Sequence, residues 1–320
     1  PAPAVARRAL AAALDQPLGY TVALGLPALR EAIAGLYRRW YGVELDPGRV
    51  VITAGSSGAF LLAFAALFEA GDRVAVGEPG YPSYRQILRA MSGEPVGMPT
   101  RFENRYQPLP ADIPGDVQGV MLASPGNPSG TMLDHAALAA LAARAAEIGA
   151  ALISDEIYHG LSYGARCVSA LEVTDDVVVI NSFSKFFSMT GWRIGWMVVP
   201  PDLVRTMDRL AANMFICPPH ASQVAALAAL SPEGEAEAQA NLAVYAENRR
   251  LLLDRLPAIG FDRIAPPDGA FYLYADVSAL TDDSAALAAE ILETAGVAVT
   301  PGIDFDPVRG RQTLRFSYAG

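Results

Sequence analysis

The chain has 320 residues, of which 52% are hydrophobic and 18% are charged, and its formal net charge is −10. This length is enough for one large domain and a smaller one. The acidic balance argues against a nucleic acid or an anionic membrane as a partner, and no apolar run approaches the roughly 20 residues of a membrane span.

Cysteines and histidines are few and widely spaced. Cys167 and Cys217 lie far apart in the sequence, and the three histidines form no cluster. Neither set fits a disulfide framework or a metal-binding spacing. We therefore expect no metal and a reducing, cytoplasmic location.

Residues 1–14 read PAPAVARRALAAAL and predict an amphipathic surface helix. From about residue 28 to 230, short apolar runs alternate with helix-length segments, and Asp134 is a candidate N-cap for one of these segments. Nearly continuous apolar strands separated by helices indicate a mostly parallel sheet covered on both faces. We expect its strands at 50–53, 73–76, 119–123, 151–154, 177–180 and 194–199.

The pattern changes after residue 230. A long helix at 236–256 precedes short strand-like runs, a second helix at 284–295 and a final run at 312–318, which is typical of an α+β unit. We therefore predict two domains, with the junction near SPEGE. These are a large α/β domain at 16–230 and a smaller α+β domain at 231–320, with residues 1–15 packing near the smaller one.

Polar and aromatic residues follow the expected strands, where open α/β sheets bind their ligands. After the first strand, AGSSGAF opens a helix, and its glycines and serines present free backbone N–H groups that suit an anion. Tyr81 follows the second strand in EPGYPSY, and Asn127 follows the third in SPGNPSG. Each of these segments alone is also compatible with an ordinary turn.

The next two strands are followed by charged residues. Asp155 closes the strand at 151–154 and is costly to bury without compensation, while Lys185 and Arg193 follow the run at 177–180. Asp155 alone could be a helix cap. Taken together, an anion cradle, an aromatic ring, an amide, a carboxylate, a lysine and an arginine describe a site for a flat, phosphorylated, cationic ring that forms a Schiff base. Pyridoxal 5′-phosphate fits this description.

The sequence also resembles the class I/II, fold-type I pyridoxal-phosphate aminotransferases over nearly the whole chain from about residue 15. The order and spacing of seven motifs carry this resemblance. They are Y-T-x-x-x-G-x-x-x-L-R-E-A-I (20–33), T-A-G-S-S (53–57), E-P-G-Y-P-S-Y (78–84), S-P-G-N-P-S-G (124–130), S-D-E-I-Y (154–158), S-F-S-K-x7-R-I-G (182–195) and L-R-F-S-Y-A (314–319).

The resemblance implies a fold-type I architecture and a role for each matching residue. Lys185, Asp155 and Tyr158 would be catalytic: Lys185 would bind the cofactor aldehyde, and Asp155 would keep the ring nitrogen protonated. Arg315 and Asn127 would bind the substrate carboxylate. The remaining cofactor contacts would come from Tyr158 and Asn127 at the ring hydroxyl, Tyr81 on the ring face, Gly55, Ser56, Ser57, Ser182 and Arg193 at the phosphate, and Tyr20 from a neighbouring subunit.

The resemblance implies a homodimeric aminotransferase that moves an amino group between an L-amino acid and a 2-oxo acid by a ping-pong mechanism. It leaves the amino donor unassigned. One alternative is a pyridoxal-phosphate lyase (β-elimination) or decarboxylase on the same fold, which would not need an added 2-oxo acid. A second is the aminotransferase-like sensor domain of a transcription regulator, which would require a basic DNA-binding module.

Overall fold

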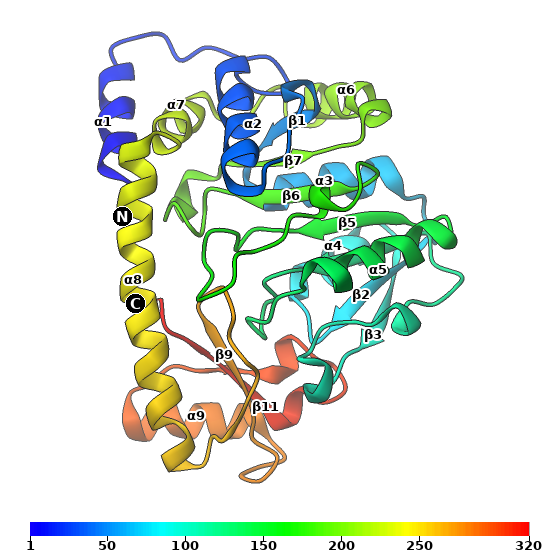
Figure 1. Cartoon of the computed structure of the whole chain (residues 1–320), viewed down its shortest axis with the longest axis vertical. Coiled ribbons are helices and arrows are strands. Elements are labelled where there is room, and N and C mark those ends of the chain that lie inside the picture. The colour runs from blue at the N-terminus through cyan, green and yellow to red at the C-terminus, as the bar shows by residue number, and fades with distance from the viewer. Residues whose placement is uncertain (320) are drawn as a thin grey trace.

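The computed structural model describes residues 1–319, which form two sheets with helices around them (Figure 1). The larger sheet has seven strands in the order β1-β7-β6-β5-β4-β2-β3. Its strands are β1 (Val50–Thr53), β2 (Arg73–Glu78), β3 (Glu94–Pro99), β4 (Gly119–Ala123), β5 (Ala151–Asp155), β6 (Val178–Ser182) and β7 (Gly195–Val198). The smaller sheet has the order β10-β11-β9-β8, with β8 (Arg263–Ile264), β9 (Tyr272–Asp276), β10 (Thr300–Pro301) and β11 (Thr313–Ser317).

The larger sheet is mostly parallel, as the sequence predicts. The pairs β2–β3, β2–β4, β4–β5 and β5–β6 are parallel. Strand β7 runs antiparallel to both of its neighbours, β1 and β6. Strand β1 therefore runs in the same direction as β6, and the carboxyl ends of β1, β2, β4, β5 and β6 meet at one edge.

Helices cover both faces of this sheet, which explains why its strands are almost continuously apolar. In β1, Val50 and Ile52 belong to one core cluster, whereas Val51 belongs to the cluster on the other face. The first cluster includes residues of α2 (Pro27–Tyr41), α5 (His135–Glu147) and α7 (His220–Ala229). The second includes residues of α3 (Gly55–Leu67), α4 (Pro82–Ala90) and α6 (Val204–Met214).

Strand β3 is the one strand of the large sheet that sequence analysis does not predict. Its sequence, EPVGMP, contains two prolines and a glycine, which are unfavourable inside a sheet. The strand is tolerated because it lies at the edge and pairs only with β2. In the remainder of the sheet the expected strands are present with small shifts at their ends. The predicted cap of α5 is also present, since the Asp134 side chain accepts from Ala137 N.

The smaller sheet is antiparallel and packs with α9 (Ser284–Ala295), whose bounds match the predicted helix. Helix α8 (Pro232–Arg255) begins within the predicted junction and runs beside both sheets (Figure 1). Helix α1 (Ala4–Ala13) packs against α7 and the start of α8, where Ala4 N donates to Glu237 Oε2 at 2.7 Å. Within residues 1–319 no helix combines the length and apolar character needed to cross a membrane.

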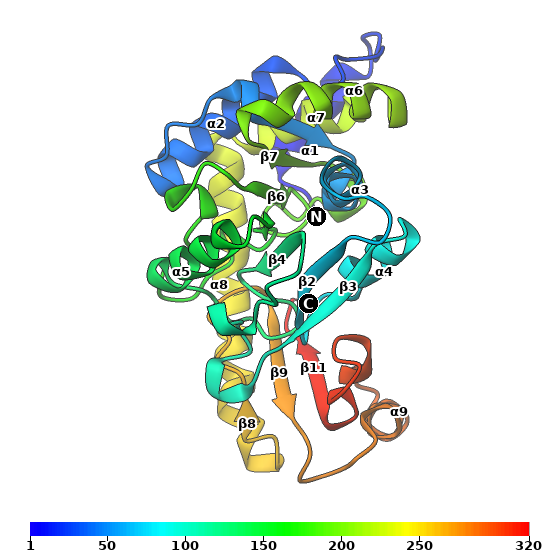
Figure 2. The same cartoon turned by 90° about the vertical axis from the view of Figure 1, so that its right-hand side faces the viewer.

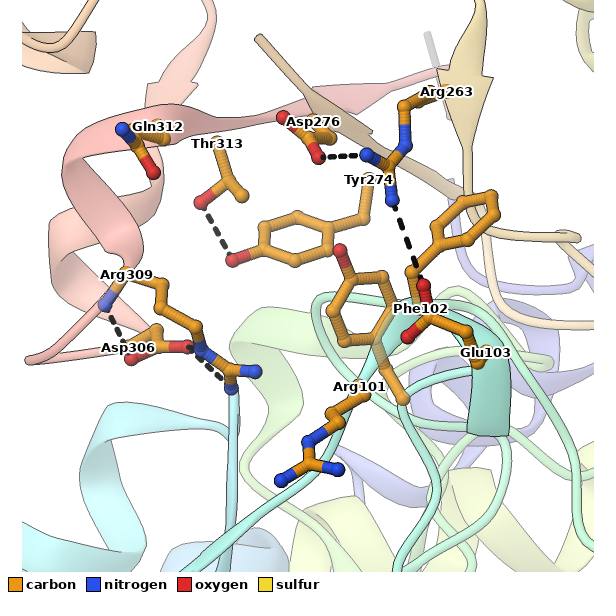
Figure 3. A pocket seen from close by; sticks show the side chains of 11 residues that line it. Arg101, Phe102, Glu103, Arg263, Tyr274, Asp276, Asp306, Arg309, Gln312 and Thr313 are labelled. Atoms are coloured by element: carbon orange, nitrogen blue, oxygen red, sulfur yellow. Dashed lines mark hydrogen bonds and ion pairs between the residues drawn. The ribbon is translucent and has the colours of Figure 1, made fainter. Parts of the chain in front are cut away.

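Arginine side chains fasten the segment 304–309 to the large sheet. Arg309 donates to Asp306 Oδ2 at 2.9 Å, to Glu78 O at 2.8 Å, and also to Thr100 O. Arg85 donates to Phe305 O at 3.1 Å. Figure 3 shows Arg309 and Asp306 at one side of a pocket of about 300 Å³, which lies between the small sheet and the segment 101–106 after β3. These contacts position Phe305 near the edge of the large sheet where the predicted site residues lie.

Candidate active site

A cavity of about 310 Å³ lies at the edge of the large sheet where the parallel strands end. Most of the site residues predicted from the sequence line it, although they come from six separate segments of the chain. These lining residues are Ser56, Ser57, Tyr81, Asn127, Asp155, Tyr158, Lys185, Arg193 and Arg315. Figure 2 shows the small sheet with β9 and β11 lying below the large sheet, on the side that contributes Arg315.

One end of the cavity is suited to an anion. Ser56 and Ser57 lie in the first turn of α3, where backbone N–H groups lack partners within the helix. Arg193 lies next to this turn: a Cβ added to Gly55 would be 2.4 Å from Arg193 Nη2. Gly55 also has φ +71°, which favours glycine. A helix N-terminus and a guanidinium at one point form a binding site for phosphate.

A buried carboxyl group lies deeper in the cavity. Asp155 is 4% exposed and accepts hydrogen bonds from Tyr84 Oη and, at 3.0 Å, from Ile157 N. Burial raises the pKa of Asp155 to about 6, despite these two hydrogen bonds and the nearby charge of Lys185. A cationic group in the cavity would favour the ionised form of this carboxyl.

The only lysine on the cavity wall is partly buried among aromatic rings. The Nζ atom of Lys185 is 5.7 Å from the ring centroid of Tyr158 and 5.8 Å from that of Phe271. Burial lowers the pKa of Lys185, and the charge of Asp155 opposes this effect only in part. A lysine with a lowered pKa is more often a neutral amine, which can act as a nucleophile or as a base.

Arg315 projects into the cavity from β11. Its Nη1 donates to Asn127 Oδ1 at 2.8 Å and its Nη2 to Thr300 Oγ1 at 3.3 Å, while its buried Nε has no partner within residues 1–319. The guanidinium carbon is 4.3 Å from the ring centroid of Tyr272 and 4.7 Å from that of Phe305. A guanidinium held in this way, with hydrogen-bonding capacity left over, is suited to a carboxylate.

Three of the predicted residues do not line the cavity. Gly55 contributes backbone only. Ser182 is buried, and its Oγ accepts from Ser184 N at 2.9 Å, so that Ser184 and not Ser182 faces the cavity. Tyr20 is 84% exposed and does not contact this cavity.

The cavity also contains residues that sequence analysis misses. They are Phe60, Tyr84, Ile157, Ser184, Thr190 and Tyr272. Tyr84 belongs to the motif EPGYPSY and follows Tyr81 by three residues, so Tyr81 is the N-cap residue of α4 and Tyr84 lies in its first turn. That spacing could have indicated Tyr84. The run AFYLYA contains no local pattern that marks Tyr272 as a site residue.

A buried polar cluster lies behind Asp155. Burial raises the pKa of Glu156 to about 8, although Ala170 N and Ser169 Oγ donate to its carboxyl at 2.7 and 2.9 Å. Burial lowers the pKa of His159 to about 3, so its imidazole is neutral. Because Ser124 O can only accept, His159 Nε2 donates to it at 2.9 Å.

We expect the stability of the protein to depend on pH through Glu156. Its folded-state pKa is above the ordinary value, so its contribution to stability is fully present below about pH 4.5 and is lost as pH rises through about 8. Glu156→Gln cannot ionise. Its Tm relative to the unsubstituted protein should therefore rise by a few degrees between pH 5 and pH 9 in thermal melts. Glu290 is exposed, so Glu290→Gln is the control. If the Tm difference of Glu156→Gln changes with pH no more than that of the control, Glu156 does not make the stability depend on pH.

Comparisons with known proteins agree with the fold. A family model described as aminotransferase class I and II matches residues 1–320. The valine–pyruvate aminotransferase of Mycobacterium tuberculosis is 53% identical over the whole chain and 84% of its own length. The crystal structure of a candidate aminotransferase from Silicibacter pomeroyi is 68% identical, with a TM-score of 0.95 over the whole chain and 84% of that protein. The aspartate aminotransferase of Thermus thermophilus, solved with maleate, is 34% identical, with a TM-score of 0.93 and the same coverages.

The fold is that of a fold-type I aminotransferase. The chain belongs to the class I and II aminotransferase family and is an enzyme that transfers amino groups. Neither the lyase nor the regulator alternative is favoured by these relatives.

Proposed function

We propose that this aminotransferase uses pyridoxal 5′-phosphate and moves the amino group of a neutral aliphatic L-amino acid, such as valine, to pyruvate by a ping-pong mechanism. The observation that carries this proposal is the meeting of Asp155, Lys185 and an anion-binding helix N-terminus in one cavity. The 53% identity to a valine–pyruvate aminotransferase supports the choice of substrates.

The residues of the cavity fit this cofactor. Ser56, Ser57 and Arg193 would hold the phosphate, with Gly55 allowing the close approach of Arg193 and Ser182 supporting the turn. Asp155 would accept from the ring N–H, because its raised pKa reflects burial without a cationic partner in contact. The ring hydroxyl and the ring face would meet Tyr158, Asn127 and Tyr81.

Residues of the chain would then move the proton and hold the substrate. When bound, the cofactor supplies an electron sink for the bond between the substrate Cα and its hydrogen. Lys185 would take that proton as a base, which its lowered pKa favours. Arg315 would hold the substrate carboxylate, and Asn127, bonded to it at 2.8 Å, would keep its guanidinium in place.

The charged residues on the cavity wall favour a substrate whose side chain is neutral. Its lysine and arginine residues are Lys185, Arg193 and Arg315, and each already has a proposed partner. A second carboxylate on the substrate would therefore lack a free cationic partner among the residues of this chain that line the cavity. Burying an unpaired carboxylate is costly, and each 1.4 kcal/mol of such cost is about tenfold in affinity.

A comparison of amino donors tests this proposal. With pyruvate as acceptor, kcat/KM for L-valine should exceed that for L-aspartate by about tenfold or more. L-Leucine and L-alanine provide the matched series for side-chain size without charge. A preference for aspartate would instead favour the second candidate function, aspartate transamination, which the Thermus thermophilus relative suggests.

We also propose that the enzyme is a homodimer in the cytoplasm, with Tyr20 reaching the phosphate site of the partner. Tyr20 lies in an exposed stretch together with Leu18 and Val22, and a second exposed apolar stretch contains Phe215 and Ile216. These stretches are neighbours, because Ala23 and Phe215 line one apolar pocket. Large exposed apolar patches mark interaction sites. The location in the cytoplasm rests on the two unpaired cysteines.

Mixing an inactive Lys185 variant with an impaired Tyr20 variant should restore activity if Tyr20 completes the partner's site. In a mixed dimer of Lys185→Ala and Tyr20→Phe chains, one site combines an intact Lys185 with an intact Tyr20. Since half of the dimers would be mixed, activity should approach about a quarter of the unsubstituted value. The Tyr20→Phe homodimer must first be measured and found impaired. No gain after confirmed subunit exchange would show that the site is not shared through Tyr20.

A further inference from the structure

Tyr272 lies between two parts of the cavity, the proposed carboxylate site and the proposed cofactor site. It is the first residue of β9, opposite Ser317 of β11, and its side chain is buried within the cavity wall. Its ring lies edge-on to Tyr158, with centroids 5.7 Å apart and an interplanar angle of 77°. The residue therefore contacts groups on both sides, the proposed carboxylate site and the proposed cofactor site.

The ring of Tyr272 constrains Arg315. The guanidinium carbon is 4.3 Å from the ring centroid, closer than its 4.7 Å distance to Phe305. An aromatic face attracts a guanidinium and restricts the plane in which it can lie. Arg315 Nη1 meanwhile donates to Asn127 at 2.8 Å. The stacking and the hydrogen bond together fix the direction in which the remaining N–H groups of Arg315 point.

The hydroxyl of Tyr272 constrains Tyr158. The two hydroxyl oxygens are 2.9 Å apart and buried, and either could donate. If Tyr158 is to donate to an acceptor in the cavity, Tyr272 must be the donor in this pair. A chain of hydroxyl groups of this kind strengthens the terminal hydrogen bond, because each bond polarises the next.

We propose that Tyr272 is a positioning residue that couples the two sites: its ring orients Arg315 for the substrate carboxylate, and its hydroxyl orients Tyr158 toward the ring oxygen of the cofactor. This inference rests on the proposed function. It predicts that the two contributions can be separated, because phenylalanine retains the ring and removes only the hydroxyl. Leucine removes both.

The chain offers a matched control two residues along the same strand. Tyr274 is also buried, and its hydroxyl also forms a hydrogen bond, to Thr313 Oγ1 at 2.7 Å. It lines the other pocket, where Figure 3 shows it beside Thr313, and it is not among the residues that line the cavity of Lys185 and Asp155. Tyr274 is opposite Arg315 in the register of β9 and β11, but its hydroxyl bonds to Thr313 and to no residue of the cavity. Tyr274→Phe therefore reproduces the loss of a buried tyrosine hydroxyl without removing a hydrogen bond of the proposed site.

Two binding measurements on the cofactor-loaded protein test the proposal without relying on turnover. The first is the midpoint pH at which the absorbance of the bound cofactor changes. The second is the Kd for 3-methylbutanoate, which has the carboxylate and side chain of valine but no amino group. Tyr272→Phe should move the midpoint pH by about half a unit or more and leave Kd within about twofold. Tyr272→Leu should in addition raise Kd about three- to tenfold.

Each result decides one part of the inference. Tyr274→Phe should change neither quantity. An unchanged midpoint pH in Tyr272→Phe would overturn the role of the hydroxyl, and an unchanged Kd in Tyr272→Leu would overturn the role of the ring. If Tyr272→Leu does not fold, Tyr272→His supplies a smaller ring for the same Kd measurement. If the unsubstituted protein shows no absorbance from bound pyridoxal 5′-phosphate, the proposed cofactor is wrong, and the inference about Tyr272 fails with it.

Discussion

Lys185→Ala should reduce transamination by at least about a thousandfold, the largest effect we expect of any single substitution. The reason is that Lys185 is the only lysine on the cavity wall, and its lowered pKa suits it both to bind the cofactor aldehyde and to move the proton at the substrate Cα. The rate of the reaction with L-valine, followed in a single turnover, measures this loss directly.

The cofactor itself should still bind to Lys185→Ala. Its proposed phosphate contacts, from the first turn of α3 and from Arg193, do not involve the lysine. Equilibrium dialysis should therefore show retained cofactor whose absorbance no longer resembles that of the unsubstituted protein. Lys185→Arg is a useful control, because it keeps a long cationic side chain but cannot act as an amine nucleophile. Near-normal turnover by either variant would contradict the role of Lys185.

Asp155→Asn should lower the rate by about a hundred- to a thousandfold, equal to about 3–4 kcal/mol in the barrier. An amide cannot balance the positive charge of a protonated ring nitrogen, so the electron sink is weakened. Asparagine can still accept from Ile157 N and receive a contact from Tyr84 Oη, the two groups that bond to Asp155. The measurement is kcat with saturating L-valine and pyruvate.

The stability of the Asp155→Asn protein distinguishes a catalytic role of Asp155 from a purely structural one. Burial raises the pKa of Asp155 to about 6, so in the cofactor-free protein its contribution to stability is present below about pH 4 and is lost as pH rises through 6. At pH 8 the cofactor-free Asp155→Asn protein should therefore be at least as stable as the unsubstituted one. A variant that loses stability at pH 8 but keeps its rate per folded molecule would assign Asp155 a capping role instead.

Much of the fold follows from local patterns in the sequence. The apolar strands of the large sheet and the helix at 284–295 are predictable because burial on both faces and helix periodicity leave clear signatures. Strand β3 is not, because its two prolines read as a turn, and only its place at the sheet edge makes them tolerable.

The site is predictable to the extent that it depends on motifs beside strand ends. Lys185 and Asp155 belong to such motifs, and the parallel sheet brings them to one edge. Tyr84 and Tyr272 depend instead on partners 71 and 114 residues away in the sequence, Asp155 and Tyr158. Contacts of this kind arise from tertiary packing, so the sequence does not reveal these partners, although the spacing of Tyr84 from Tyr81 could have indicated that Tyr84 lies at the site.

The most direct test of the account separates the two half-reactions. The purified, cofactor-loaded protein is mixed with L-valine and no oxo acid, and the absorbance of the bound cofactor is followed. We expect this absorbance to be lost once, with one 2-oxo acid released per site. Added pyruvate should then restore the absorbance, with one L-alanine formed per site. Continuous release of product from L-valine without pyruvate, or no change in the cofactor absorbance, would contradict transamination by this site.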